Sequence, residues 1–141
     1  MAVTLDLGDV DDIHPRNKRA FAHRLALLAE AQSYGQPIRS RGPEFIRAIP
    51  QGTAMIAYFS HGAGLVNRDL AATVFEVAGE DRTFHAARGT IVGETLLVSS
   101  SMVPKPIAVR YAWHNAPVAV LFNSAELPAA PFRSDTWPSG K

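Results

Sequence analysis

Residues 83–99, TFHAARGTIVGETLLVS, contain three short runs that are typical of β-strands. The runs cover residues 83–86, 90–92 and 95–99, and each combines threonine with large apolar residues. A Val-Gly-Glu sequence separates the last two runs, and glycine at such a point favours a tight hairpin turn. The stretch therefore predicts antiparallel strands that follow one another closely along the chain.

The same pattern extends over the rest of the chain. Turn sequences such as AGED and HNAP separate four further β-type runs, at residues 54–59, 72–77, 107–113 and 118–122. Strands at this spacing predict an antiparallel β domain over residues 53–141, and a sandwich of two sheets is the expected arrangement. Residues 123–141 form an irregular tail without a clear period, which we expect Phe132 and Trp137 to hold against the surface.

The first 36 residues predict a strand, a loop and a helix, so the fold class is mixed α+β. Val3, Leu5 and Leu7 alternate with polar residues, as in a half-buried strand. Residues 37–52 are punctuated by proline and glycine. We therefore expect them to connect residues 1–36 to the β domain, with at most one short turn or strand of their own.

The predicted helix covers residues 15–34. Pro15 suits the first helical turn, where its missing N–H leaves no bond unmade, and Gly35 is placed to end the helix in a left-handed conformation. An apolar stripe with i, i+4, i+7 spacing follows one side of the helix and consists of Phe21, Leu25 and Leu28. The stripe predicts that the helix packs against another element.

Length and composition limit the functions open to the chain. Its 141 residues suit one globular domain, and the absence of cysteine excludes disulfides, thiolate metal sites and a cysteine nucleophile. The 14 lysines and arginines balance 13 acidic residues, so we expect no nucleic-acid binding. No apolar run approaches the roughly 18 residues of a membrane span, so we expect no membrane partner. The chain begins MAVTLDLGDVDD, which lacks the features of a signal peptide, and its location stays unassigned.

The loop before the predicted helix carries the clearest chemical signal. It reads GDVDDIH over residues 8–14, with Asp11 three residues and Asp12 two residues before His14. A nearby carboxylate that accepts the Nδ1 hydrogen fixes the imidazole tautomer, while Nε2 takes a proton from a hydroxyl group. The same residues also suit a helix N-terminus with acidic neighbours and a surface histidine. The spacing alone leaves both interpretations open.

Longer strings carry a resemblance over nearly the whole chain. The C-terminal part of the sialate O-acetylesterase-type carbohydrate O-acetylesterases is similar to LDLGDVDDIHPRNKRAFAHRLALLAEAQSYG, FSHGAGL, FEVAGEDRTFHAARGTIVGETLLVSS, MVPKPIAVRYAW and LFNSAELPAAPFRSDTWP. This family lies in the SGNH hydrolase superfamily. The resemblance implies that residues 1–36 are the remnant of an SGNH α/β hydrolase domain. It also implies that His14 is the general base of a serine hydrolase and that Asp11 or Asp12 orients it; the sequence does not separate the two aspartates.

The resemblance also implies a nucleophilic serine and oxyanion donors in earlier blocks that this chain does not contain. None of its nine serines lies in a Gly-Asp-Ser, Gly-Gln-Ser-Asn or Gly-x-Ser-x-Gly context. A single missing oxyanion donor costs about 3–4 kcal/mol of transition-state stabilisation. We therefore expect a truncated, C-terminal piece of an acetylesterase that needs no cofactor and is inactive alone. It would act on acetylated carbohydrate only together with the missing N-terminal segment.

A second function is a non-catalytic β-sandwich module that binds glycan or packs on a partner protein. Tyr111, Trp113 and His114 end one predicted strand, where they suit either a sugar-stacking platform or an ordinary core strand. Three cations suit either an anionic sugar or simple ion pairing: Lys105, Arg110 and Arg133.

Two further expectations concern binding. The five histidines show no spacing typical of metal ligands, so we expect no metal site. The strand and helix of residues 1–36 would lack the sheet that covers them in a complete hydrolase domain. We therefore expect the isolated chain to self-associate through them.

Overall fold

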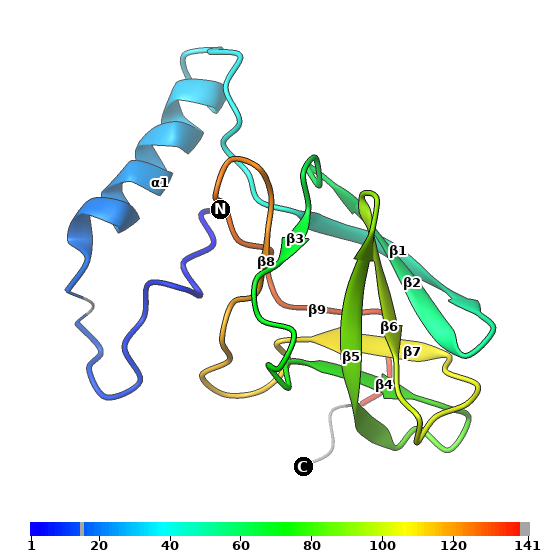
Figure 1. Cartoon of the computed structure of the whole chain (residues 1–141). Coiled ribbons are helices and arrows are strands. Elements are labelled where there is room, and N and C mark those ends of the chain that lie inside the picture. The colour runs from blue at the N-terminus through cyan, green and yellow to red at the C-terminus, as the bar shows by residue number, and fades with distance from the viewer. Residues whose placement is uncertain (15, 139–141) are drawn as a thin grey trace.

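The computed structural model describes residues 1–14 and 16–138. The helix α1 stands on one side of the molecule, and the strands gather on the other (Figure 1). In chain order the elements are α1 (Lys18–Gln32), β1 (Glu44–Gln51), β2 (Ala54–Ser60), β3 (Val66–Asn67), β4 (Phe75–Ala78), β5 (Phe84–Val92), β6 (Thr95–Ser99), β7 (Ala108–Tyr111), β8 (Leu121–Phe122) and β9 (Phe132–Arg133).

The helix α1 has local signals at both ends. The side chain of Asn17 accepts a hydrogen bond from the Ala20 N–H at 3.1 Å and so caps the N-terminus. Beyond the C-terminus, Gly35 has a φ of +67°. The Gln36 N–H then bonds back to the Glu30 carbonyl at 3.0 Å. The predicted helix and its terminating glycine are therefore present, and the cap is Asn17 rather than either aspartate of the preceding loop.

The prediction of a strand over residues 3–7 is wrong. The chain makes a turn there, in which the Leu7 N–H donates to the Thr4 carbonyl at 3.0 Å, and Leu5 packs against the β core. A strand needs a neighbour to satisfy its backbone groups, and no described strand pairs with this segment. Pro15, the expected start of the helix, lies outside the described residues.

Seven strands form one antiparallel sheet in the order β1-β2-β6-β5-β4-β7-β9, and β3 pairs with β8 beside it. Phe45 of β1 and Phe132 of β9 stack on each other, so the two edges of the sheet come together and the sheet is nearly closed. The antiparallel β class is thus confirmed. The arrangement differs from the expected sandwich, because strand pairing runs without a break from β1 to β9 rather than dividing into two stacked sheets.

The boundaries of the β part also differ from expectation. The strand β1 lies in the segment expected to be a connector; Pro50 is tolerated there because β1 pairs only with β2. The strand β9 lies in the tail expected to be irregular. The hairpin between β5 and β6 turns at Gly93, with a φ of +62°, as the Val-Gly-Glu sequence predicts.

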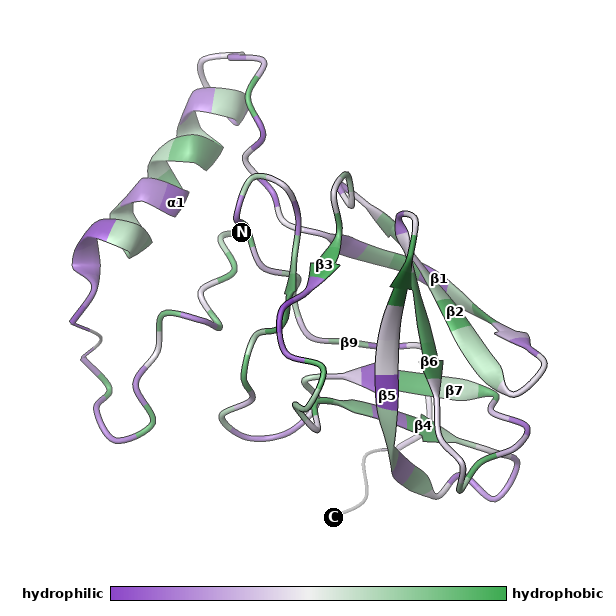
Figure 2. Ribbon diagram, in the orientation of Figure 1, coloured by the Kyte–Doolittle hydropathy of each residue, from purple (hydrophilic) through white to green (hydrophobic). Residues whose placement is uncertain are grey.

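The core of the molecule lies inside the curved sheet. Its hydrophobic residues follow β4, β6 and β7, whereas α1 alternates between hydrophobic and hydrophilic residues (Figure 2). Only Arg24 and Leu28 of α1 are buried, while Phe21 and Leu25 are 39% and 49% exposed. The predicted apolar stripe therefore docks only in part. In the described part of the chain, no helix is long and apolar enough to cross a membrane.

Candidate functional site

The histidine loop, residues 8–14, is held by two short contacts between side chain and backbone. Asp9 Oδ1 accepts the Asp11 N–H at 3.1 Å, and Asp12 Oδ1 accepts the His14 N–H at 2.8 Å. Such i to i+2 bonds are typical of aspartate in turns. They give the loop a defined course just before α1 begins.

The structure brings His14 and Asp12 together. The Nδ1 atom of His14 lies 3.5 Å from Oδ1 of Asp12. Asp11 enters the same loop through its backbone N–H, which is bonded to Asp9. Of the two aspartates that the sequence left open, Asp12 is thus the one whose carboxylate faces the imidazole.

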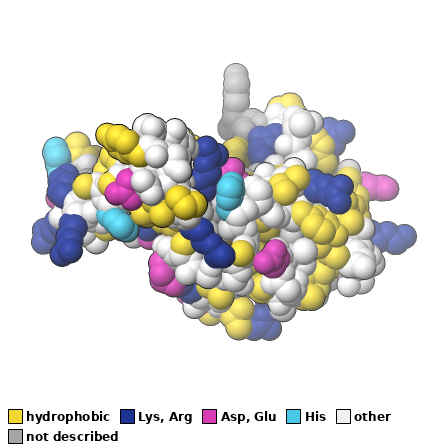
Figure 3. Space-filling view, turned by 90° about the horizontal axis from the view of Figure 1, so that it is seen from above, with side chains coloured by type: hydrophobic (Ala, Val, Ile, Leu, Met, Phe, Trp, Pro, Cys, Tyr) yellow, Lys and Arg dark blue, Asp and Glu magenta, His cyan; other side chains and the backbone are white. Residues whose placement is uncertain are grey.

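The imidazole of His14 is open to solvent. Its side chain is 79% exposed, and histidine side chains reach the surface on the α1 side of the molecule (Figure 3). An imidazole that lies beside a carboxylate and is open to solvent can exchange a proton with a group that approaches from outside. The arrangement can therefore serve as a general base for a nucleophile that lies elsewhere.

A partly buried ion pair, which the sequence did not predict, ties the segment before the histidine loop to α1. Arg24 Nη1 and Nη2 donate to the two carboxylate oxygens of Asp6 at 2.5 and 2.6 Å, and Nη1 also donates to the Val3 carbonyl at 2.7 Å. Arg24 lies one turn before Leu28, on the buried side of α1. That spacing was the signal in the sequence that this arginine faces inward.

A groove of about 420 Å³ lies beside the histidine loop. Residues 5, 6 and 8–10 line one side of it, and residues 116–119, in the loop between β7 and β8, line the other. The β part of the chain therefore contributes surface next to the histidine loop.

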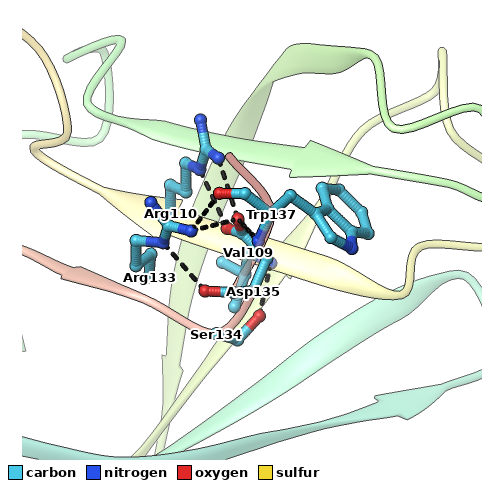
Figure 4. A network of polar contacts seen from close by, with 6 residues as sticks. All are labelled: Val109, Arg110, Arg133, Ser134, Asp135 and Trp137. Carbon is cyan, nitrogen blue, oxygen red and sulfur yellow. Dashed lines mark hydrogen bonds and ion pairs between the residues drawn. The ribbon is translucent and has the colours of Figure 1, made fainter. Parts of the chain in front are cut away.

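Two of the three cations considered for an anionic sugar, Arg110 and Arg133, are engaged within the protein, whereas Lys105 is exposed. Arg110 donates to both carboxylate oxygens of Asp135 at 2.9 Å, and Arg133 lies 3.1 Å from the same carboxylate (Figure 4). The Asp135 side chain is only 1% exposed. Hydrogen bonding from Arg110 holds the pKa of Asp135 below its ordinary value, and the same bond raises the pKa of Arg110. This network holds the tail on the sheet. Of the two roles that the sequence left open for Arg110 and Arg133, the structure shows ion pairing.

The proposed aromatic platform is not assembled. Tyr111 is a core residue whose hydroxyl accepts the N–H groups of Val120 and Leu121, and burial raises its pKa. Trp113 remains partly exposed, and the Arg133 guanidinium lies over its ring. Within residues 1–14 and 16–138, no group of three or more potential ligands gathers to hold a metal ion.

Comparison with known proteins gives the site a context. No established family model matches the chain. Sialate O-acetylesterases from mouse and rat are both 31% identical to it over 94% of its length. The crystal structure of a carbohydrate acetylesterase from Xanthomonas citri shares 42% identity, with a TM-score of 0.89 over 96% of the chain.

The chain is homologous to one part of the sialate O-acetylesterases. It spans 27% of the mouse relative's length and 32% of the Xanthomonas citri acetylesterase chain. The similarity includes the histidine loop, because it extends over nearly the whole chain. The acetylesterase relatives therefore supply a chemical context for the exposed His14–Asp12 pair.

Proposed function

We propose that the chain is the C-terminal segment of a carbohydrate O-acetylesterase and supplies the histidine and aspartate of a Ser-His-Asp triad. The observation that carries this proposal is the approach of Asp12 Oδ1 to His14 Nδ1 at 3.5 Å on an exposed loop. His14 is the general base and Asp12 the residue that orients it. Asp11 is the second candidate for the orienting role.

The reaction follows from these roles. Nε2 of His14 removes the proton of a serine hydroxyl as the serine oxygen attacks the acetyl carbonyl carbon. The imidazolium then gives that proton to the departing sugar oxygen, which leaves an acetyl-serine. The same imidazole then deprotonates a water molecule whose oxygen attacks the acetyl carbonyl carbon; the bond to the serine oxygen breaks, the imidazolium returns the proton to that oxygen, and acetate leaves. The carboxylate of Asp12 stabilises the imidazolium in both steps.

The serine and the oxyanion donors come from a segment outside this chain, which must dock beside the histidine loop. Apolar side chains are exposed in the histidine loop, at Val10 and Ile13, and partly exposed on the helix that follows it, at Phe21 and Leu25. Burying one such side chain stabilises an association by roughly 1.5–3 kcal/mol. Contact with another protein segment would remove these apolar side chains from water and so stabilise the association.

Reconstitution from two pieces tests the proposal. The chain is co-expressed with the part of the Xanthomonas citri acetylesterase that has no counterpart in it, and hydrolysis of 4-nitrophenyl acetate is measured. We expect the pair to be active and the chain alone to be inactive. His14→Ala should lower kcat by at least about 10³-fold, because the serine loses its base. His23→Ala is the matched control, since His23 is an exposed histidine on α1, and it should keep the activity.

Three results would contradict the proposal. A stable pair that hydrolyses no ester would favour the non-catalytic module, and glycan binding by that pair would support this second function directly. Equal activity of the His14→Ala and His23→Ala pairs would remove His14 from the mechanism. Hydrolysis by the chain alone, lost in His14→Ala, would mean that one of its own serines reaches the imidazole.

A further inference from the structure

We propose that Arg24 and Asp6 are positioning residues that hold the His14–Asp12 pair in its working place. The inference rests on the proposed function and adds two residues that lie outside the Asp11–His14 pattern. The ion pair between them acts as a clamp on the histidine loop, and we call it the Arg24–Asp6 clamp.

The clamp joins the two ends of the segment that carries the site. Asp6 lies just before the histidine loop, and Arg24 lies in the second turn of the helix that follows it. Nη1 and Nη2 of Arg24 donate to the two carboxylate oxygens of Asp6, and Nη1 also donates to the Val3 carbonyl. The ion pair therefore links the residues just before the histidine loop to the second turn of α1.

The clamp is also the point at which α1 meets the β part. The Arg24 side chain is only 10% exposed, although it is the side chain of a charged residue. It borders a small hollow together with Met1, Gly42 and Pro128. On the other side, the charge of Asp6 lies close enough to the core to help burial raise the pKa of Tyr111. The position of the clamp is thus set by the β core.

The chemistry of the pair suits positioning. A guanidinium and a carboxylate that share two parallel hydrogen bonds fix direction as well as distance, which an ammonium group does not do. Within residues 8–14, which the structure describes, the loop is held by the aspartate contacts described above, and all of these residues except Asp12 are exposed. Without the clamp, Asp12 and His14 would keep their local contact while the loop as a whole loses its place relative to α1.

The first test is structural and uses the 141-residue chain alone. Backbone order parameters are measured by NMR for residues 9–14 in Asp6→Asn, Arg24→Lys and Arg24→Met. We expect them to fall from about 0.8 to below about 0.6 in all three variants, while those of β4 and β7 are unchanged. Arg19→Met is the control, because Arg19 is an exposed arginine of the same helix. Unchanged order parameters at residues 9–14 in Asp6→Asn and Arg24→Lys would overturn the proposal.

The second test uses the two-piece enzyme. We expect Asp6→Asn and Arg24→Lys to lower kcat at least tenfold with KM within twofold, because docking survives and the imidazole is misplaced. Arg19→Met should be unchanged in both. A fall in kcat that merely follows the loss of folded enzyme, measured from the unfolding curve of each variant, would overturn the positioning role.

The two tests separate this inference from the proposed function. If His14→Ala leaves the two-piece enzyme fully active, the proposed function fails, whatever the order parameters show. If His14→Ala abolishes activity while Asp6→Asn and Arg24→Lys leave both the loop and kcat unchanged, only the clamp is contradicted.

Discussion

The phenyl rings of Phe45 and Phe132 stack with their centroids 4.4 Å apart and their planes inclined by only 2°. The two residues come from β1 and β9, the first and last strands of the seven-stranded sheet. Phe59 of β2 meets Phe132 edge-on at 5.5 Å. This aromatic contact joins the edges of the sheet and places the tail of the chain against its first hairpin.

Replacing Phe132 by alanine should lower the free energy of unfolding by about 3–5 kcal/mol, because the buried ring and its stacking contact with Phe45 are both lost. Urea denaturation measures this change. Ile46→Ala is the control, since Ile46 lies beside Phe45 on β1 but is mostly exposed, and it should change stability by less than about 1 kcal/mol. Equal effects of the two substitutions would show that the stack does not close the sheet.

The Arg110–Asp135 pair should make stability depend on pH in the acid range. The pKa of Asp135 is lowered in the folded state, so its contribution is present above the unfolded pKa of about 3.9 and is lost as the pH falls through the folded-state pKa. Asp135→Asn should be less stable than the parent by roughly 3 kcal/mol at pH 7. The difference should persist down to about pH 5 and shrink below about pH 4.

Unfolding curves at several pH values measure this difference. Glu80→Gln serves as the control, because Glu80 is exposed and its substitution should change the free energy of unfolding by less than about 0.5 kcal/mol. A difference between Asp135→Asn and the parent that stays constant from pH 7 to pH 3 would contradict the assignment.

Gly42 should not tolerate a larger residue. A Cβ atom there would lie 2.0 Å from the Pro128 carbonyl oxygen, so two backbone segments would have to separate. We expect Gly42→Ala to destabilise the chain by about 1–3 kcal/mol. Gly8→Ala is the control, because a Cβ atom there meets nothing within 4 Å. A thermal unfolding midpoint for Gly42→Ala equal to that of Gly8→Ala would contradict the close packing seen here.

We propose that the isolated chain self-associates through the partly exposed Phe21 and Leu25 of α1, in place of the segment that would cover them in the esterase. Sedimentation should show a dimer whose fraction rises with concentration. Leu25→Glu should return the chain to a monomer, and Ile46→Glu, on a different surface, should not. Adding the part of the Xanthomonas citri acetylesterase that has no counterpart in this chain should lower the fraction of dimer, because both would cover the same side chains. A parent chain that stays monomeric at millimolar concentration would contradict the idea.

Sequence reasoning succeeds in this chain where a pattern has a local cause. The helix and Gly35 follow from periodicity and backbone freedom, and the turn at Gly93 follows from hairpin geometry. It fails where the pairing of a segment with a distant strand decides whether that segment forms a strand. Residues 3–7 alternate like a strand but have no neighbouring strand, while residues 44–51 contain a proline and still form an edge strand because β2 lies beside them.

The site shows the same division. The D-x-x-H pattern and the resemblance to the acetylesterases single out His14 and leave two aspartates open. Only the course of the loop shows that Asp12 faces the ring. The ion pair between Arg24 and Asp6 joins residues 18 positions apart, so no local sequence pattern predicts it.

The central claim is that His14 and Asp12 form the base and its orienting acid, and the ratio of two rates in the two-piece enzyme tests it most directly. Asp12→Asn should lower kcat for 4-nitrophenyl acetate by about 10⁴-fold, because an amide in place of the carboxylate favours the wrong imidazole tautomer. Asp11→Asn should lower it less than tenfold. Equal and small effects of the two substitutions beside an inactive His14→Ala would show that neither aspartate orients the histidine. A large loss confined to Asp11→Asn would assign the role to Asp11 and contradict the geometry described here.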